Sequence, residues 1–340
     1  MYFAILWKNN EISRAELEIL QPENLKNIKK DIIIFNTKYP ELIKNLWWII
    51  KAWSVFTERD LQEILKDTKI IWIQEESIGK HLKKTIWVRR FKLVNINHTD
   101  REIKNKGKEL INLDNGIFGV VEQYQNIELY ETIDFEKPGR SMSMGMMPAK
   151  LTHIMLNIWL TQISKDVARN VSIYDPFAWS WTTWLLANYF WYDFLGSDLK
   201  INYLEDNIKR REKSKFFNKE KNFTIFQHDI TKPLPKEVEN KNILIVTEWR
   251  LGPIVTKETS KNQVVYYQNQ VEKVYSNFLE QTKGIPAVFT IPYYTDQDNF
   301  LEENLKKTAE QYWISLTSIP EIYKREGQNV GRKIIITSPK

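Results

Sequence analysis

The stretch IYDPFAWSWTTWLLANYFWYDFLGSD, residues 173–198, decides the fold of the larger part of this chain. An apolar strand ends in Asp-Pro-Phe, a turn and a helix follow, and a second strand ends in Gly-Ser-Asp. A turn that holds a nucleotide-like ligand needs glycine, because only a residue without a Cβ lets the backbone approach the ligand closely. Here the turn carries Trp179 and Trp181. The frame therefore predicts a ligand-binding turn, and two of its residues do not suit one.

The same alternation continues from residue 171 to the C-terminus. Strands are predicted at 171–177, 192–198, 223–229, 242–249 and 287–294, and a final pair at 315–326 and 331–339. Because helical patterns separate most of the first five strands, they are expected to form a parallel, doubly wound sheet, with the final pair antiparallel at one edge. The fold class is α/β, and residues 151–340 form a Rossmann-like domain.

The first 135 residues have a different pattern. Short strands alternate with amphipathic helices, which indicates an α+β region over 1–135. Residues 116–135 (GIFGVVEQYQNIELYETIDF) are predicted to form two strands, and a helix is expected at 200–217. The Pro/Gly-punctuated segment 136–150 is the expected junction between the two domains.

Composition excludes several classes of protein. The 340 residues are 42% hydrophobic and 27% charged, without a long uncharged apolar run or an N-terminal signal pattern. The absence of cysteine excludes disulfides and thiolate metal sites, and the four histidines lack the spacing of metal ligands. A net charge of +6 weakly favours a polyanionic partner. We expect a cytoplasmic protein with no membrane association and no metal.

Acidic residues recur where successive strands end. Asp175, Asp198 and Asp229 close the first, second and third strands of the doubly wound domain. In such a sheet these ends face one crevice, where ligands bind. A carboxylate after the second strand can accept both ribose hydroxyls of an adenosine, and one after the third can accept the adenine amino group. A single Asp at a strand end is most often a turn residue, but three in succession favour a nucleoside site.

Several stretches resemble one enzyme family. DPFAWSWTT (175–183) is similar to the Asp-Pro-Phe-Cys-Gly-Ser-Gly-Thr loop of amino-directed S-adenosylmethionine-dependent methyltransferases. Four more stretches resemble segments of the tRNA (guanine-N2) methyltransferases of the archaeal and eukaryotic position-10 type and their bacterial relatives: YFAILWKNNEISRAELEIL (2–20), LWWIIKAW (46–53), RSMSMGMMPAKLTHIMLNI (140–158) and IYKREGQNVGRKI (322–334). The resemblance covers nearly the whole chain.

The resemblance implies a cofactor site for S-adenosylmethionine. The residues that it places there are Lys150, Asp175, Pro176, Phe177, Ala178, Trp179, Ser180, Trp181, Thr182, Asp198 and Asp229. It also implies a THUMP-like RNA-binding region within 1–135 and tRNA as the partner. It leaves open whether a small activator subunit is needed.

The fourth strand of the doubly wound domain carries the implied target-base site. Relatives have Asn/Asp-Pro-Pro-Tyr/Phe there, or Thr-Glu-Pro-Tyr-Leu-Gly-Pro in bacteria, whereas this chain has Thr247, Glu248, Trp249 and Arg250. Glu248 is expected to accept a hydrogen bond from the target amine, and Arg250 to stack on or clamp a base. The loss of the Pro-Tyr pair also fits a degenerate loop with altered activity.

Tryptophan stands where these patterns have glycine. Trp7, Trp47, Trp48, Trp53, Trp179, Trp181 and Trp191 occupy such places. The chain has 11 glycines and 13 tryptophans, and together they come close to the ordinary glycine frequency of about 7%. Some bacteria decode UGA as glycine, while a common alternative table reads it as tryptophan. We therefore expect most of these tryptophans to be glycine in the living protein; as written, Trp179 and Trp181 would fill the place of the methionine part of the cofactor.

Three functions follow as hypotheses. The first is methyl transfer from S-adenosylmethionine to an exocyclic guanine N2 of tRNA. The second is a DNA amino-methyltransferase, which shares the Asp-Pro-Phe loop but carries a different recognition region. The third is a non-catalytic RNA-binding relative that keeps the fold.

Overall fold

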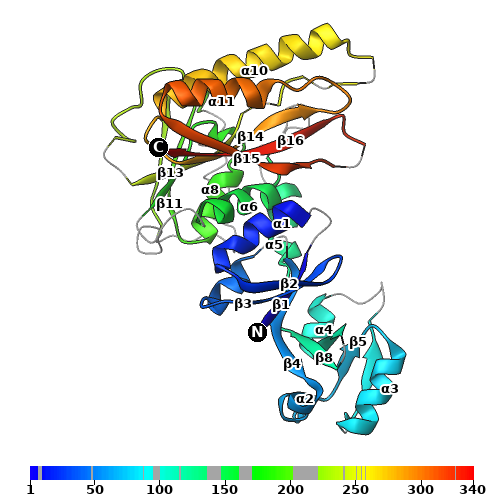
Figure 1. Cartoon of the computed structure of the whole chain (residues 1–340). Coiled ribbons are helices and arrows are strands. Elements are labelled where there is room, and N and C mark those ends of the chain that lie inside the picture. The colour runs from blue at the N-terminus through cyan, green and yellow to red at the C-terminus, as the bar shows by residue number, and fades with distance from the viewer. Residues whose placement is uncertain are drawn as a thin grey trace. The chain divides into compact units, whose positions relative to one another are not determined.

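The chain folds into two compact units, Met1–Asn126 and Ile127–Lys340, in the computed structural model (Figure 1). The structure describes residues 1–6, 10–46, 49–86, 88–94, 100–114, 116–135, 147–160, 171–201, 221–239, 242–249, 251–253, 255–256, 258–325 and 327–340. The division falls earlier than the boundary expected at residue 135. Part of the sequence assigned to the first domain therefore belongs to the second unit.

The first unit contains one mixed sheet flanked by short helices. The sheet order is β2-β3-β1-β4-β8-β7-β5-β6, with β9 also paired to β4. Its elements are β1 (Tyr2–Leu6), α1 (Asn10–Leu17), η1 (Glu18–Leu20), β2 (Glu23–Lys29), β3 (Ile32–Asn36), η2 (Pro40–Asn45), β4 (Ile49–Thr57), α2 (Glu58–Leu65), β5 (Ile71–Ile73), α3 (Glu76–Thr85), β6 (Phe91–Leu93), α4 (Asp100–Lys106), β7 (Lys108–Asp114), β8 (Ile117–Val121) and β9 (Gln123–Tyr124). An α+β region was predicted here, and this part of the prediction agrees with the structure.

The second unit is built on a seven-stranded sheet in the order β12-β11-β10-β13-β14-β16-β15. Its elements are α5 (Ile127–Phe135), α6 (Ala149–Leu160), β10 (Ser172–Asp175), η3 (Ala178–Ser180), α8 (Thr182–Tyr189), β11 (Asp193–Asp198), β12 (Phe223–Gln227), β13 (Ile243–Glu248), α10 (Lys261–Gln281), β14 (Ala287–Tyr294), α11 (Leu301–Gln311), β15 (Ile314–Tyr323) and β16 (Val330–Pro339). The first five strands are parallel, whereas β16 pairs antiparallel with both β14 and β15. The predicted Rossmann-like sheet with an antiparallel terminal pair is confirmed.

The core of the second unit lies between the sheet and its covering helices. Apolar side chains from β10, β13 and β14 meet the inner faces of α10 and α11, with Val271, Tyr275 and Phe278 among the buried residues of α10. The centre of β13 is buried at every position from Ile243 to Thr247. Continuous apolar strands of this kind are typical of parallel sheets that are covered on both faces.

The structure differs from the sequence-based prediction at α5 and β2. Residues 127–135 were predicted as strand but form α5, because Leu129, Tyr130 and Ile133 recur at helical spacing and are buried together. The strand β2 was missed because it is mostly exposed and polar, and so lacks a buried face that would reveal it. The helix expected at 200–217 falls largely outside the described residues.

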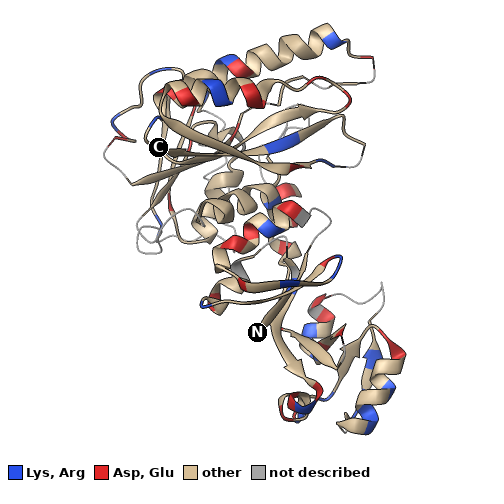
Figure 2. Ribbon diagram, in the orientation of Figure 1, with Lys and Arg blue, Asp and Glu red and all other residues tan. Residues whose placement is uncertain are grey.

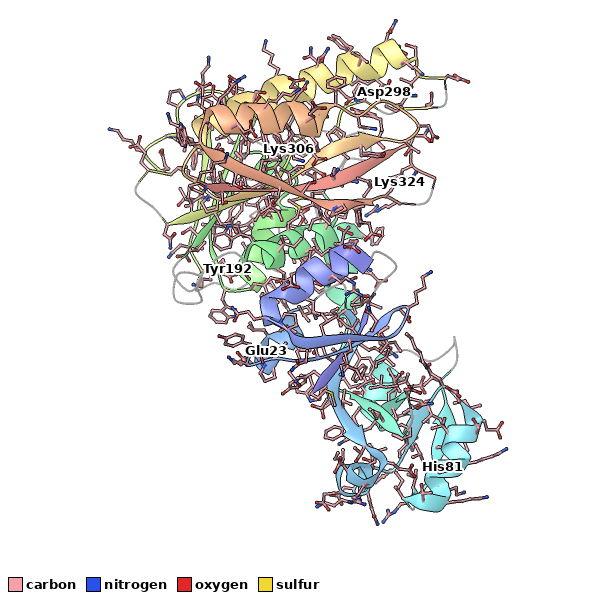
Figure 3. All side chains as sticks on the ribbon, viewed as in Figure 1. Glu23, His81, Tyr192, Asp298, Lys306 and Lys324 are labelled. Carbon is pink, nitrogen blue, oxygen red and sulfur yellow. The ribbon has the colours of Figure 1, made fainter. Side chains whose placement is uncertain are left out.

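The charged residues of α11 are paired along the helix surface. Lys306 lies 2.7 Å from Glu302, and Lys307 lies 2.8 Å from Glu303, each at i,i+4 spacing. Figure 2 shows both signs of charge on this helix, and Figure 3 labels Lys306 on it. Within the described ranges, none of the helices has the length and apolar character needed to cross a membrane.

Candidate functional site

The site is set by the place where the sheet reverses its strand order. From β10 the chain adds β11 and β12 on one side and then returns to add β13 and β14 on the other. Such a reversal leaves a crevice outside the carboxyl ends of the two central strands, and ligands of open α/β sheets bind there. The residues beside this reversal are those at the carboxyl ends of β10, β11, β12 and β13.

Asp175 ends β10 and ties it to β13. Its Oδ1 accepts hydrogen bonds from the Phe177 backbone N–H at 3.0 Å and from the Thr247 hydroxyl at 2.5 Å. Burial raises the pKa of this carboxyl to about 6, although both hydrogen bonds favour the ionised form. Asp175 is only 4% exposed. The buried Asp175 carboxylate therefore links β10 to β13 through its hydrogen bonds, and it is not exposed at the ends of these strands.

The turn after β10 packs closely on the neighbouring strand. Pro176 is buried, Phe177 lies 6.4 Å from the rings of both Trp249 and Tyr275, and Ala178 opens the short helix η3. A Cβ built on Gly196 of β11 would lie 3.1 Å from the Ala178 Cβ. This close approach explains why β11 carries a glycine two residues before its end.

The rest of the turn leads into α8. Ser180 ends η3, and its side chain lies outside the described residues. Thr182 is the first residue of α8 and is 1% exposed. Trp179 is half-buried, and its backbone amide favours the ionised form of Asp198.

The indole of Trp181 packs in the core. It meets Trp184 of α8 edge-on at 5.0 Å and Phe194 of β11 at 6.5 Å, and the residue is 1% exposed. Its Nε1 is buried, and no described residue accepts a hydrogen bond from it. This indole, expected from the sequence to occupy the place of the cofactor's methionine part, packs against α8 and is shielded from solvent.

Asp198 and Asp229 differ in their surroundings. Burial raises the pKa of Asp198, opposed by amide donors that include Lys200 N–H at 3.2 Å. Asp229 accepts from the backbone N–H and the hydroxyl of Thr231, at 3.0 and 2.8 Å, and these bonds lower its pKa. The His228 N–H donates to the Asp198 carbonyl at 3.2 Å, so the two strand ends are directly connected. Carboxylates on adjacent strand ends are suited to accept from the hydroxyl and amino groups of a nucleoside.

Glu248, at the end of β13, is held by a network that the sequence did not reveal. Its Oε1 accepts from the Thr290 hydroxyl at 2.7 Å and from Arg332 Nε at 2.6 Å, and its Oε2 accepts from Arg332 Nη2 at 3.2 Å. The side chains of Glu248 and Arg332 are only 5% and 6% exposed. A carboxylate has about four acceptor sites, so these three bonds leave room for one more on Oε2.

Thr247 and Trp249, on either side of Glu248, make hydrogen bonds within the fold. The Thr247 hydroxyl points to Asp175, and the Trp249 N–H donates to the Tyr275 hydroxyl at 3.1 Å. That same hydroxyl donates to the Thr290 carbonyl at 2.6 Å. Arg250 lies outside the described residues. Four residues were expected to face the target base. Among those that the structure describes, Glu248 has a side-chain acceptor site that these hydrogen bonds leave open.

Arg332, Thr290 and Tyr275 were not assigned a role from the sequence. Arg332 lies in the closing stretch that resembles the methyltransferase family, so a signal was present without a function attached to it. Tyr275 had no such signal, because an aromatic residue in an amphipathic helix ordinarily predicts core packing.

Lys150 lies in the first turn of α6. Burial lowers the pKa of its amine, and the carboxylate of Asp134 opposes this shift. Asp134 also accepts from the Ala149 N–H at 2.9 Å and lies 4.0 Å from Arg325. The structure therefore groups Lys150 with α5 and the segment before β16.

Comparisons with known proteins give structural likenesses only. No family model matches the sequence, and no curated protein matches it.

Among the described residues, no group of three His, Cys, Asp or Glu side chains is placed to hold a metal ion.

Solved structures similar to the chain include three methyltransferases. Magnesium protoporphyrin IX methyltransferase from Synechocystis with bound SAH is 10% identical, with 62% of this chain and 98% of that chain covered and a TM-score of 0.37. An S-adenosylmethionine-dependent methyltransferase from Clostridium acetobutylicum is 9% identical, with coverages of 56% and 98% and a TM-score of 0.32. The METTL16 methyltransferase domain is 11% identical, with coverages of 49% and 73% and a TM-score of 0.34.

Other similar structures are matched over about half of their length. The chain covers 48% of EvdMO1 and 52% of the CMeT domain of the citrinin polyketide synthase. All these TM-scores are low, so the Rossmann-like assignment rests on the strand order of the second unit itself.

Proposed function

We propose that the second unit is an S-adenosylmethionine-dependent methyltransferase. One observation carries the proposal: a carboxylate ends each of β10 and β11, and Asp229 follows two residues after the end of β12, beside the reversal of strand order. Asp198 and Asp229 are the acceptors suited to a nucleoside's donors, Asp198 for the ribose hydroxyls and Asp229 for the adenine amino group. The resemblance of the turn at 175–183 to the cofactor loop of amino-directed methyltransferases supports the same assignment.

The residues at this edge fit the cofactor in chemistry. The ribose and adenine of S-adenosylmethionine offer hydroxyl and amino donors, and the two carboxylates offer acceptors. The cofactor supplies an activated methyl group when it is bound. The protein's own task is then to align that group with a nucleophile, because direct displacement depends mainly on positioning.

Glu248 is the residue proposed to orient the target amine. Its Oε2 has one acceptor site left after the hydrogen bonds from Arg332 and Thr290 are counted. A hydrogen bond to this oxygen would direct the lone pair of an exocyclic amine toward the methyl group.

For the substrate, we propose guanine N2 of tRNA, with the first unit as a THUMP-like RNA-binding module. The support is the resemblance of four stretches outside the cofactor loop and the net charge of +6. A cytoplasmic location is part of this proposal, and the lack of cysteine is consistent with it. A small activator subunit remains an option within this proposal.

A non-catalytic RNA-binding relative is the second candidate, and one observation favours it. Trp249 occupies the place of a residue that would contact the base, yet its ring packs inward against Phe177 and Tyr275. If no other group stacks on the base, target binding is weakened.

Methyl transfer from labelled S-adenosylmethionine to bulk tRNA, total RNA and DNA tests the proposal. The full chain should be assayed as written and with glycine at 179 and 181. Label in tRNA, recovered as N2-methylguanine, supports the proposal. Label in DNA alone would favour the DNA enzyme, and RNA binding without any transfer would favour the non-catalytic relative.

A further inference from the structure

The backbone places three tryptophans in a conformation that suits glycine. Six non-glycine residues of the described chain have positive φ, and three of them are Trp181 at 59°, Trp191 at 66° and Trp313 at 60°. The left-handed region is sterically unfavourable for an L-residue, and only glycine, with Asn and Asp some way behind, visits it routinely. For a bulky side chain this conformation is a genuine outlier.

Trp191 stands where helices most often place glycine. Its N–H donates to the Asn188 carbonyl at 3.1 Å, and the Tyr192 N–H donates to the Ala187 carbonyl at 2.8 Å. These two bonds, around a left-handed residue just after the C-cap Phe190, define a Schellman motif at the end of α8. The motif satisfies carbonyls at the end of the helix and normally has glycine at this position.

Trp313 occupies the corresponding position at the end of α11. It follows the C-cap Tyr312, has positive φ, and donates its N–H to the Glu310 carbonyl at 3.3 Å. This tryptophan lies outside every motif on which the glycine hypothesis was based. The backbone therefore identifies it independently.

The exposed indoles at these two helix ends contribute little packing that would offset the strained backbone. Trp191 is 58% exposed and Trp313 is 77% exposed. Trp181 is buried instead, with an indole N–H that no described residue accepts. By contrast, Trp72, Trp159 and Trp184 lie within a strand or a helix, and none of them has positive φ.

We infer that residues 181, 191 and 313 are glycine in the protein made by its source organism. The gene would then carry UGA at these positions, decoded as glycine, and the tryptophans arise from translation by another code. Glycine at 191 and 313 removes the strain at both helix ends while keeping the capping hydrogen bonds. Glycine at 181 removes the same strain at the N-cap of α8, within the proposed cofactor turn. This inference does not depend on the proposed activity.

Peptide sequencing by mass spectrometry tests it on the protein purified from source cells. The expected result is glycine at 181, 191 and 313 in the peptides that span them. Tryptophan at 191 or 313 would overturn the inference, as would UGG codons at those positions in the gene.

Variants of the full chain test the physical basis separately. Glycine and alanine both remove the indole, so comparing Trp313→Gly with Trp313→Ala, and Trp191→Gly with Trp191→Ala, isolates the effect of φ. Each glycine variant should melt higher than its alanine partner, by about 2–4 °C in a unit of this size. Tyr266, 59% exposed in α10, is the matched control, where alanine should melt higher than glycine. Equal or reversed order at both 191 and 313 would overturn the inference.

Discussion

The guanidinium of Arg332 on β16 donates two hydrogen bonds to the carboxylate of Glu248 at the end of β13, from Nε to Oε1 at 2.6 Å and from Nη2 to Oε2 at 3.2 Å. The contact joins the last strand of the chain to the strand that carries the proposed target site. Because both side chains are nearly inaccessible, each charge depends on the other for its stability.

Removing one partner of this pair should be costly. Arg332→Met leaves the Glu248 carboxylate buried without its main donor, and the free energy of unfolding should fall by about 3–5 kcal/mol in urea titrations. The double variant with Glu248→Gln should recover part of this loss, since no unpaired charge remains. Lys307→Met breaks an exposed pair on α11 and serves as the control, with no measurable change expected. Equal effects of Arg332→Met and Lys307→Met would contradict the account.

Asp175 should make the protein less stable as pH rises. Its folded pKa, raised to about 6, lies above the unfolded value of 3.8, so its favourable contribution is complete below pH 3.8 and is lost as pH rises through 6. Relative to Asp175→Asn, the parent chain should lose up to about 3 kcal/mol of unfolding free energy between pH 4 and pH 7. Measuring both chains by urea denaturation isolates this group from Asp198 and His228, whose pKa values are also shifted. A constant difference between the two chains would show that folding does not raise the pKa of Asp175, and would contradict the account.

The Tyr275 hydroxyl should hold the turn after β13. Tyr275→Phe leaves the Trp249 N–H and the Thr290 carbonyl without this partner, at a cost of about 1–3 kcal/mol of unfolding free energy. Methyl transfer should fall as well, because the turn carries the proposed target site. Tyr266→Phe, on the exposed side of the same helix, is the control and should change neither quantity. Loss of stability with full activity would place Tyr275 in the scaffold alone.

Gly196 should be intolerant of even one methyl group. In Gly196→Ala the new Cβ would lie 2.6 Å from the Phe194 ring and 3.1 Å from the Ala178 Cβ, so the ring must shift and the turn after β10 must give way slightly. We expect a loss of about 1–3 kcal/mol in unfolding free energy and weaker binding of S-adenosylmethionine. Adding Ala178→Gly should restore part of both. If the double variant binds no better than Gly196→Ala, the contact with Ala178 is not what limits the site.

The strand pattern of the second unit could be predicted because each strand is a short apolar run closed by a turn signal. This is why the parallel sheet, its antiparallel end and the acids at 175, 198 and 229 all followed from sequence. Residues 127–135 were misassigned, since a short mixed apolar segment fits both strand and helix until its burial is known.

The roles within the site were harder to predict. Sequence position placed Thr247 and Glu248 together at a strand end. In the structure, the Thr247 hydroxyl donates to Asp175, whereas the Glu248 carboxylate accepts from Arg332. Partners such as Arg332 and Tyr275 come from strands and helices far along the chain, and no local pattern specifies which side chains meet. The side-chain direction of Trp181 was likewise decided by packing under α8.

Binding of S-adenosylmethionine to the full chain tests the central claim most directly. Equilibrium dialysis with labelled cofactor should compare the chain bearing glycine at 179 and 181 with the same chain carrying Asp198→Asn. The account predicts saturable binding at one site, competed by S-adenosylhomocysteine and weakened tenfold or more, about 1.4 kcal/mol, by Asp198→Asn. No saturable binding by the glycine-bearing chain, or binding that Asp198→Asn leaves unchanged, would contradict it.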